Sequence, residues 1–137
     1  MATVIRPELS KRNKYWISRH RYYELKHYCL QYNEWKKLYL AMTPSIQSPK
    51  FSRGEKLEKQ NDPAGELAAK RADLALKMQL VEETAICTDR ELYSYILAAV
   101  TEGRSYTYLK TVMSIPCSKD YFYERYRKFF WLLSKSR

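Results

Sequence analysis

Basic and aromatic side chains are interleaved in the C-terminal stretch SIPCSKDYFYERYRKFFWLLSK, residues 114–135. Arginine can donate two hydrogen bonds to guanine, lysine pairs with phosphate, and tyrosine can reach a phosphate or pack on a thymine methyl group. A helix over 119–135 would bury a stripe formed by Phe122, Tyr126, Phe129, Phe130 and Leu133. Its other side would carry the candidate nucleic-acid-binding residues Lys119, Tyr121, Tyr123, Arg125, Arg127 and Lys128. We predict a face suited to DNA, the alternative being an amphipathic helix whose charges are simply solvated.

Three short helices are expected to position this face, near 89–102, 105–114 and 119–135. Gly103 is a natural C-terminal cap for the first, and Ser105 can cap the second. Ser118 or Cys117 would precede the third. This order of elements is typical of a helix-turn-helix domain over about 105–135.

The turn of this unit is SIPCSK, about two residues longer than in the tightest helix-turn-helix arrangements. Leu109, Met113 and Ile115 are expected to hold the first helix and the turn against the second helix. Lys110, close to the turn, is a further candidate for contact with nucleic acid.

The N-terminal part, residues 1–43, is predicted to be a basic, tyrosine-rich helical segment. Residues 9–43 contain no Gly or Pro and read as one long helix or two short ones. The apolar positions follow helical spacing, at Leu25, Tyr28, Tyr32, Trp35, Tyr39 and Met42. Arg19 and Arg21 are candidates for nucleic-acid contact, since aromatic side chains beside basic ones can stack on bases. The same composition suits a protein interface or simply a helical core.

Residues 44–62 read as a flexible linker, because Pro44, Pro49, Gly54 and many polar residues remove helical periodicity. Pro63 after Asp62 predicts a helix start, and the apolar spacing then continues to about Cys87. Thr88 and Glu91 form a capping-box pattern, which either opens a new helix or is one turn inside a continuing helix. We therefore expect an all-α protein with a helical domain over 63–137.

Catalytic and metal chemistry find little support in the sequence, and we expect neither an enzyme nor a cofactor. His20, Glu24 and His27 share a helix face but lack further ligands, so ordinary surface histidines are favoured over a metal site. The three cysteines lie far apart, which argues against a disulfide framework and favours a reducing cytoplasm. Cys117 beside Lys119 at a helix N-terminus would have a lowered thiol pKa.

The net charge of +10 is concentrated at the two ends of the chain. Residues 1–40 carry nine Lys and Arg against three acids, and residues 93–137 carry eight against three. Such ends suit a polyanion, while an acidic protein or an anionic membrane would fit almost as well. No signal-type apolar stretch or membrane-spanning run is found, so we expect no membrane partner.

The segment YTYLKTVMSIPCSKDYFYERYRKFFWLL resembles late-gene transcription regulators of Gram-positive phages and prophages, the RinA/ArpU type. In these proteins the C-terminal part is similar to region 4 of a sigma factor. The segment RYYELKHYCLQYNEWKK is similar to small prophage proteins. The resemblance implies binding to phage promoter DNA and contact with RNA polymerase or another regulator.

The leading hypothesis is a phage-type, sequence-specific DNA-binding transcription regulator in the bacterial host cytoplasm, with double-stranded DNA and RNA polymerase or another host protein as partners. A homodimer is compatible with this hypothesis. The competing hypothesis is a phage-encoded anti-immune protein that inhibits a host nuclease or ribonucleoprotein through its basic surface. A third is a packaging protein such as a small terminase subunit.

Overall fold

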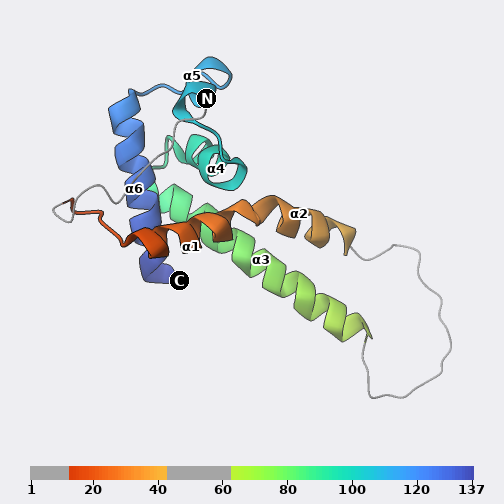
Figure 1. Cartoon of the computed structure of the whole chain (residues 1–137). Helices are drawn as coiled ribbons and strands as arrows, with labels where there is room; N and C mark the ends of the chain where they lie inside the picture. The colour runs from red at the N-terminus through yellow and green to blue at the C-terminus, as the bar shows by residue number, and fades with distance from the viewer. Residues whose placement is uncertain (1–12, 43–62) are drawn as a thin grey trace, which may run out of the picture.

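The structure, a computed structural model, describes residues 13–42 and 63–137, and every regular element in these two ranges is a helix. The helices are α1 (Arg19–Leu30), α2 (Tyr32–Ala41), α3 (Pro63–Thr88), α4 (Tyr93–Glu102), α5 (Tyr106–Thr111) and α6 (Lys119–Ser136) (Figure 1). The all-α prediction is confirmed. The predicted linker over 44–62 and the first twelve residues of the N-terminal segment lie outside the described residues.

Of the two predicted alternatives, one long helix or two short ones, the described part of the N-terminal segment forms two consecutive helices that meet at Gln31. The Ser18 side chain accepts a hydrogen bond from the Arg21 N–H and caps α1. At Gln31 the backbone N–H bonds back to the Tyr28 carbonyl at 3.2 Å, which tightens the last turn. The rings of Tyr28 and Trp35 then meet edge to face, with their centroids 4.8 Å apart. This ring contact therefore spans the junction between α1 and α2.

Helix α3 begins at Pro63, as predicted, but the capping box after it does not form. The Thr88 hydroxyl is buried and donates to the Thr84 carbonyl at 2.7 Å, inside the helix. The Asp89 carboxylate accepts hydrogen bonds from the N–H groups of Glu91 and Leu92, at 2.9 and 3.0 Å. Asp89 thus caps this turn in place of Thr88, because the threonine continues α3 by one residue.

Gly103 ends α4 in the left-handed conformation, with φ of 69°. A Cβ atom at this position would meet only the Leu30 side chain, at the ordinary contact distance of 3.9 Å. We predict that Gly103→Ala lowers the free energy of unfolding by about 1 kcal/mol, because an L side chain is strained at this φ. Urea denaturation measures the change. Gly103→Asn is the control and should lose less, since asparagine tolerates this conformation, and equal losses would contradict the prediction.

One core unites the described helices, and residues of α1 and α2 belong to it together with those of α3 to α6. The predicted stripe of α6 is buried at every position: Phe122, Tyr126, Phe129, Phe130 and Leu133. Helix α1 crosses α6, so that the Tyr22 and Phe130 rings meet edge to face at 5.1 Å (Figure 1). None of the described helices is long and apolar enough to cross a membrane.

Candidate nucleic-acid interface

Helix α5, the following turn and the start of α6 form a fixed unit at one end of the molecule (Figure 1). The side chains of Ser105 and Ser118 cap the two helices by accepting from the N–H groups of Tyr108 and Tyr121. The Tyr106 hydroxyl donates to the Cys117 carbonyl at 2.6 Å and so ties α5 to the end of the turn.

The turn covers residues 112–118, because α5 ends at Thr111, three residues earlier than predicted. Ser114 has a positive φ of 56°, which brings the Ile115 N–H back to the Leu109 carbonyl at 3.0 Å. Leu109 and Ile115 are buried, as the sequence predicted. A connection of seven residues exceeds the roughly 3–4 residues usual in a helix-turn-helix, so α5 and α6 have a spacing of their own.

Lys110 and Lys119 are exposed on either side of this turn. The Lys119 ammonium group lies 5.7 Å from the centroid of the Tyr123 ring. Tyr123 is half-buried beside the rings of Tyr106 and Phe122, and burial raises the pKa of its hydroxyl. The half-buried Tyr123 ring therefore packs against the Lys119 side chain. Lys110 and Lys119 are the cations most open to an anionic ligand at this end.

The sequence suggested that Arg125 extends freely from α6. In the structure its side chain instead turns back toward the protein. Its side chain is only 16% exposed and pairs with Glu124 at 3.0 Å. It also donates to the Thr88 carbonyl at 3.3 Å, and its guanidinium lies 5.2 Å from the centroid of the Tyr121 ring. The free carbonyls at the C-terminus of α3 attract a cation, and this attraction turns Arg125 toward the body of the protein.

Tyr121 is exposed, and its hydroxyl donates to the Asp89 carboxylate at 3.1 Å. This hydrogen bond to a carboxylate is the main reason that the pKa of Tyr121 is raised. Tyr121 and Arg125 together therefore fasten α6 to the junction between α3 and α4.

Arg127 and Lys128 are both half-buried in the middle of α6. The Arg127 Nε is buried without a hydrogen-bond partner among the described residues. Neither Arg127 nor Lys128 has an ion pair among those that the structure describes.

A second group of cations lies where the start of the described chain meets the C-terminal half of α6. Arg21 pairs with Glu24 at 2.7 Å and reaches the Ser134 carbonyl at 3.4 Å, while Arg19 is exposed. The Tyr15 and Trp131 rings lie 5.4 Å apart, centroid to centroid. Lys14 lies over Tyr15 at 5.1 Å, and Lys135 lies over Trp131 at 4.4 Å.

The structure thus places seven of the nine predicted residues in two groups, and Arg127 and Lys128 lie in the middle of α6 outside both groups. Lys110 and Lys119 flank the turn, and Tyr123, Tyr121 and Arg125 support the same end of α6 from its two sides. Arg19 and Arg21 belong to the other group, where Lys14 and Lys135 join them. Sequence reasoning missed these two lysines, although the spacing of four residues between Trp131 and Lys135 was a signal that they share a helix face.

The described residues contain no cluster of three or more side chains able to hold a metal ion. His20, Glu24 and His27 are exposed on α1, and Glu24 is engaged by Arg21. The pKa of the Cys117 thiol is raised by burial and by Asp89, so the expected lowering is wrong. Ser118 rather than Cys117 occupies the cap of α6, which removes the basis for that expectation.

Thiol labelling of the folded protein should proceed first at Cys87, the exposed cysteine. Burial raises the pKa of Cys29 to about 12, so at neutral pH this thiol is protonated as well as shielded. We expect Ellman's reagent to modify Cys29 only after unfolding, and Cys87→Ser to remove the fast phase. Modification of Cys29 in the native protein at the rate of Cys87 would contradict the packing of α1.

Comparison of the chain with protein-family models, with curated proteins and with solved structures found no match.

Proposed function

We propose that this protein is a phage-type DNA-binding transcription regulator that contacts duplex DNA through the α5–turn–α6 unit, in the manner of a helix-turn-helix. The observation that carries the proposal is the fixed turn between α5 and α6, with the exposed cations Lys110 and Lys119 on its two sides. Two exposed cations on either side of a hydrogen-bonded turn, one of them at the start of an amphipathic helix, are suited to fixing that helix on the phosphate backbone. The net charge of +10 supports the same type of ligand.

The roles within the unit follow from the contacts of each side chain. Lys110, Lys119 and Lys128 pair with phosphates in this proposal. None of them has an acidic partner among the described residues, and none has a buried, unpartnered nitrogen as Arg127 does. Arg125 is a positioning residue, since it bonds to the end of α3 and holds α6 at a fixed angle. The cations Lys14, Arg19 and Lys135 form a second contact to the DNA backbone.

The seven-residue turn affects how bases are read. In a tighter unit the first helix supports the second directly along its length, whereas here Tyr106 and Cys117 make the connection at the turn. We propose that phosphate contacts supply most of the affinity and that base contacts come from the exposed first turn of α6. We propose that, after DNA binding, the protein contacts RNA polymerase in the cytoplasm of a bacterial host and so regulates transcription.

The double variant Lys110→Ala/Lys119→Ala tests this function. We expect weaker binding to duplex DNA by about 1–3 kcal/mol, and the slope of log K against log salt concentration should fall by about one for each lysine–phosphate pair removed. Fluorescence anisotropy of labelled promoter and unrelated duplexes, in a series of salt concentrations, measures both quantities.

The matched control is Lys36→Ala/Lys37→Ala, which removes the same charge from the exposed side of α2. Arg125→Ala should lower the melting temperature and leave the affinity of the folded fraction nearly unchanged. Equal loss in both double-lysine variants would show charge attraction without a defined site and would overturn the proposal. Retention of a host nuclease or ribonucleoprotein by the full chain after nuclease treatment would favour the competing inhibitor function.

A further inference from the structure

Helix α2 and residues 63–76 of α3 form a two-helix arm that extends away from α5 and α6 (Figure 1). In α2 the buried residue is Trp35, and in this part of α3 it is Leu74. The arm nevertheless carries four of the exposed aliphatic side chains of the described chain, Leu38, Leu40, Leu67 and Leu76. These four do not share one face, since residues two positions apart on a helix differ by about 200°. Leu38 among them lines an apolar groove between the two helices.

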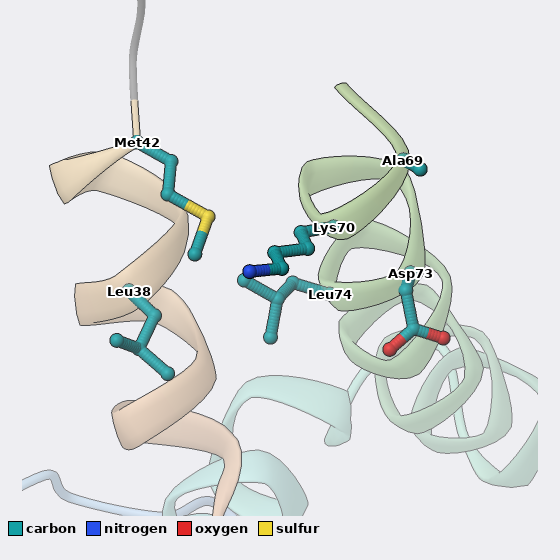
Figure 2. A pocket seen from close by; sticks show the side chains of 6 residues that line it. All are labelled: Leu38, Met42, Ala69, Lys70, Asp73 and Leu74. Atoms are coloured by element: carbon teal, nitrogen blue, oxygen red, sulfur yellow. The ribbon is translucent and has the colours of Figure 1, made fainter. Parts of the chain in front are cut away.

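A groove of about 340 Å³ lies between the two helices of the arm (Figure 2). Leu38 of α2 and Met42, the residue that caps the end of α2, line one side, and Leu74 of α3 lines the other. Leu38 is 50% exposed, so the groove opens to the surrounding solvent. Lys70 extends across Leu74 toward α2 (Figure 2).

The polar residues of the groove carry opposite charges, Lys70 and Asp73, three residues apart on α3. Asp73 forms an ion pair with Lys77 at 3.3 Å, but the Asp73 side chain is 65% exposed, so this bond is weak. The groove therefore has no net charge in a chain of charge +10. A polyanion would gain little electrostatic binding energy in the groove. A partner with one positive and one negative side chain at the same spacing would complement the charges of Lys70 and Asp73.

A second copy of this chain has that pattern. When two α3 helices lie antiparallel across a two-fold axis, Lys70 of each copy faces Asp73 of the other, and the leucine-lined grooves face each other. The basic unit at α5 and α6 lies away from this contact, so the positive ends of the two copies stay apart. Like charges elsewhere then add little repulsion to the pairing.

We infer that the arm is a homodimer interface, in which two copies pair antiparallel through α3 and exchange Lys70–Asp73 ion pairs across a shared apolar groove. The inference goes beyond the proposed function and holds whether or not DNA is the ligand. The proposed assembly is a closed two-fold dimer, because pairing with one copy covers the whole self-complementary patch.

Sedimentation equilibrium of the full chain, with charge-swap variants, tests the pairing. Lys70→Glu places two acids opposite each other and should weaken the dimer by about tenfold or more in Kd. Asp73→Lys should do the same through opposed lysines. The double variant Lys70→Glu/Asp73→Lys restores opposite charges across the axis and should recover most of the affinity.

Leu38→Glu should also weaken the dimer, while Ile86→Glu, an exposed apolar residue of α3 outside the groove, should leave the Kd unchanged. Circular dichroism shows that each variant is folded. A monomer at every concentration, a higher-order ring, or a dimer insensitive to the charge swaps would overturn the inference. The DNA-binding test with Lys110 and Lys119 is read separately, at concentrations where the oligomeric state is known.

Discussion

Phe130→Ala is expected to lower the free energy of unfolding by about 3–5 kcal/mol, because it leaves a large cavity among rings. Phe130 is fully buried, and its ring lies 5.1 Å from Tyr22, 5.0 Å from Tyr126 and 5.0 Å from Phe129, measured between centroids. Two helices supply these rings, so they cannot close the cavity without moving α1 against α6. Removing each edge-to-face ring pair costs about 0.5–1.5 kcal/mol beyond the buried area.

Urea denaturation followed by circular dichroism measures this loss. Phe130→Leu keeps most of the volume and should cost about 1.5 kcal/mol or less, which separates the cavity from the change of residue. Val112→Ala, at a side chain 61% exposed, should change stability by less than about 0.5 kcal/mol. A decrease of less than about 1 kcal/mol for Phe130→Ala would mean that α1 does not pack on α6 as described.

The buried pair of tyrosine hydroxyls gives the second large effect. The Tyr22 and Tyr126 hydroxyl oxygens lie 3.0 Å apart in the core, and burial raises the pKa of Tyr126 well above 10.0. Tyr22→Phe should cost about 1–3 kcal/mol, because the Tyr126 hydroxyl then remains in the core without this hydrogen bond. Tyr22→Phe/Tyr126→Phe should be more stable than Tyr22→Phe alone, since no orphaned hydroxyl is left.

The comparison between the single and the double variant isolates the hydroxyl of Tyr126, because both lack the hydroxyl of Tyr22. Their free energies of unfolding in urea should differ by about 1 kcal/mol in favour of the double variant. A double variant less stable than Tyr22→Phe would show that the Tyr126 hydroxyl finds another acceptor.

The pH dependence of stability follows from the same pair. A tyrosine whose folded pKa is raised contributes its full stability below the unfolded pKa, near 10.0, and loses it as the pH rises toward the folded value. The wild-type protein should therefore lose stability above about pH 10. The double phenylalanine variant should lose less over the same range.

The helical periodicity of α6 could be predicted from the sequence because its apolar residues repeat at the helical period without interruption. The serine caps and the left-handed Gly103 could also be predicted, since each depends on local backbone chemistry. The capping box at Thr88 does not form, because the threonine hydroxyl donates to the carbonyl four residues back instead of accepting from a backbone N–H at a helix start.

The orientation of Arg125 and the cations at Tyr15 and Trp131 depend on contacts between residues far apart in the chain. Arg125 meets Thr88 across thirty-seven positions, and Arg21 meets Ser134 across one hundred and thirteen. Helical spacing places a side chain on a face but does not say which neighbouring helix approaches that face. For this reason the apolar half of α6 was predictable and its charged half was only partly so.

Helix α3 runs without interruption from the apolar groove to the carbonyl that Arg125 binds. Its 26 residues correspond to about 39 Å, at about 1.5 Å per residue. Each residue added to or removed from its middle would change that length by about 1.5 Å and rotate one end against the other by about 100°. In the proposed dimer, the length of α3 would set both the separation and the relative rotation of the two α5–turn–α6 units. If these units bind DNA as proposed, the same length would set the spacing between the half-sites that the dimer can bridge.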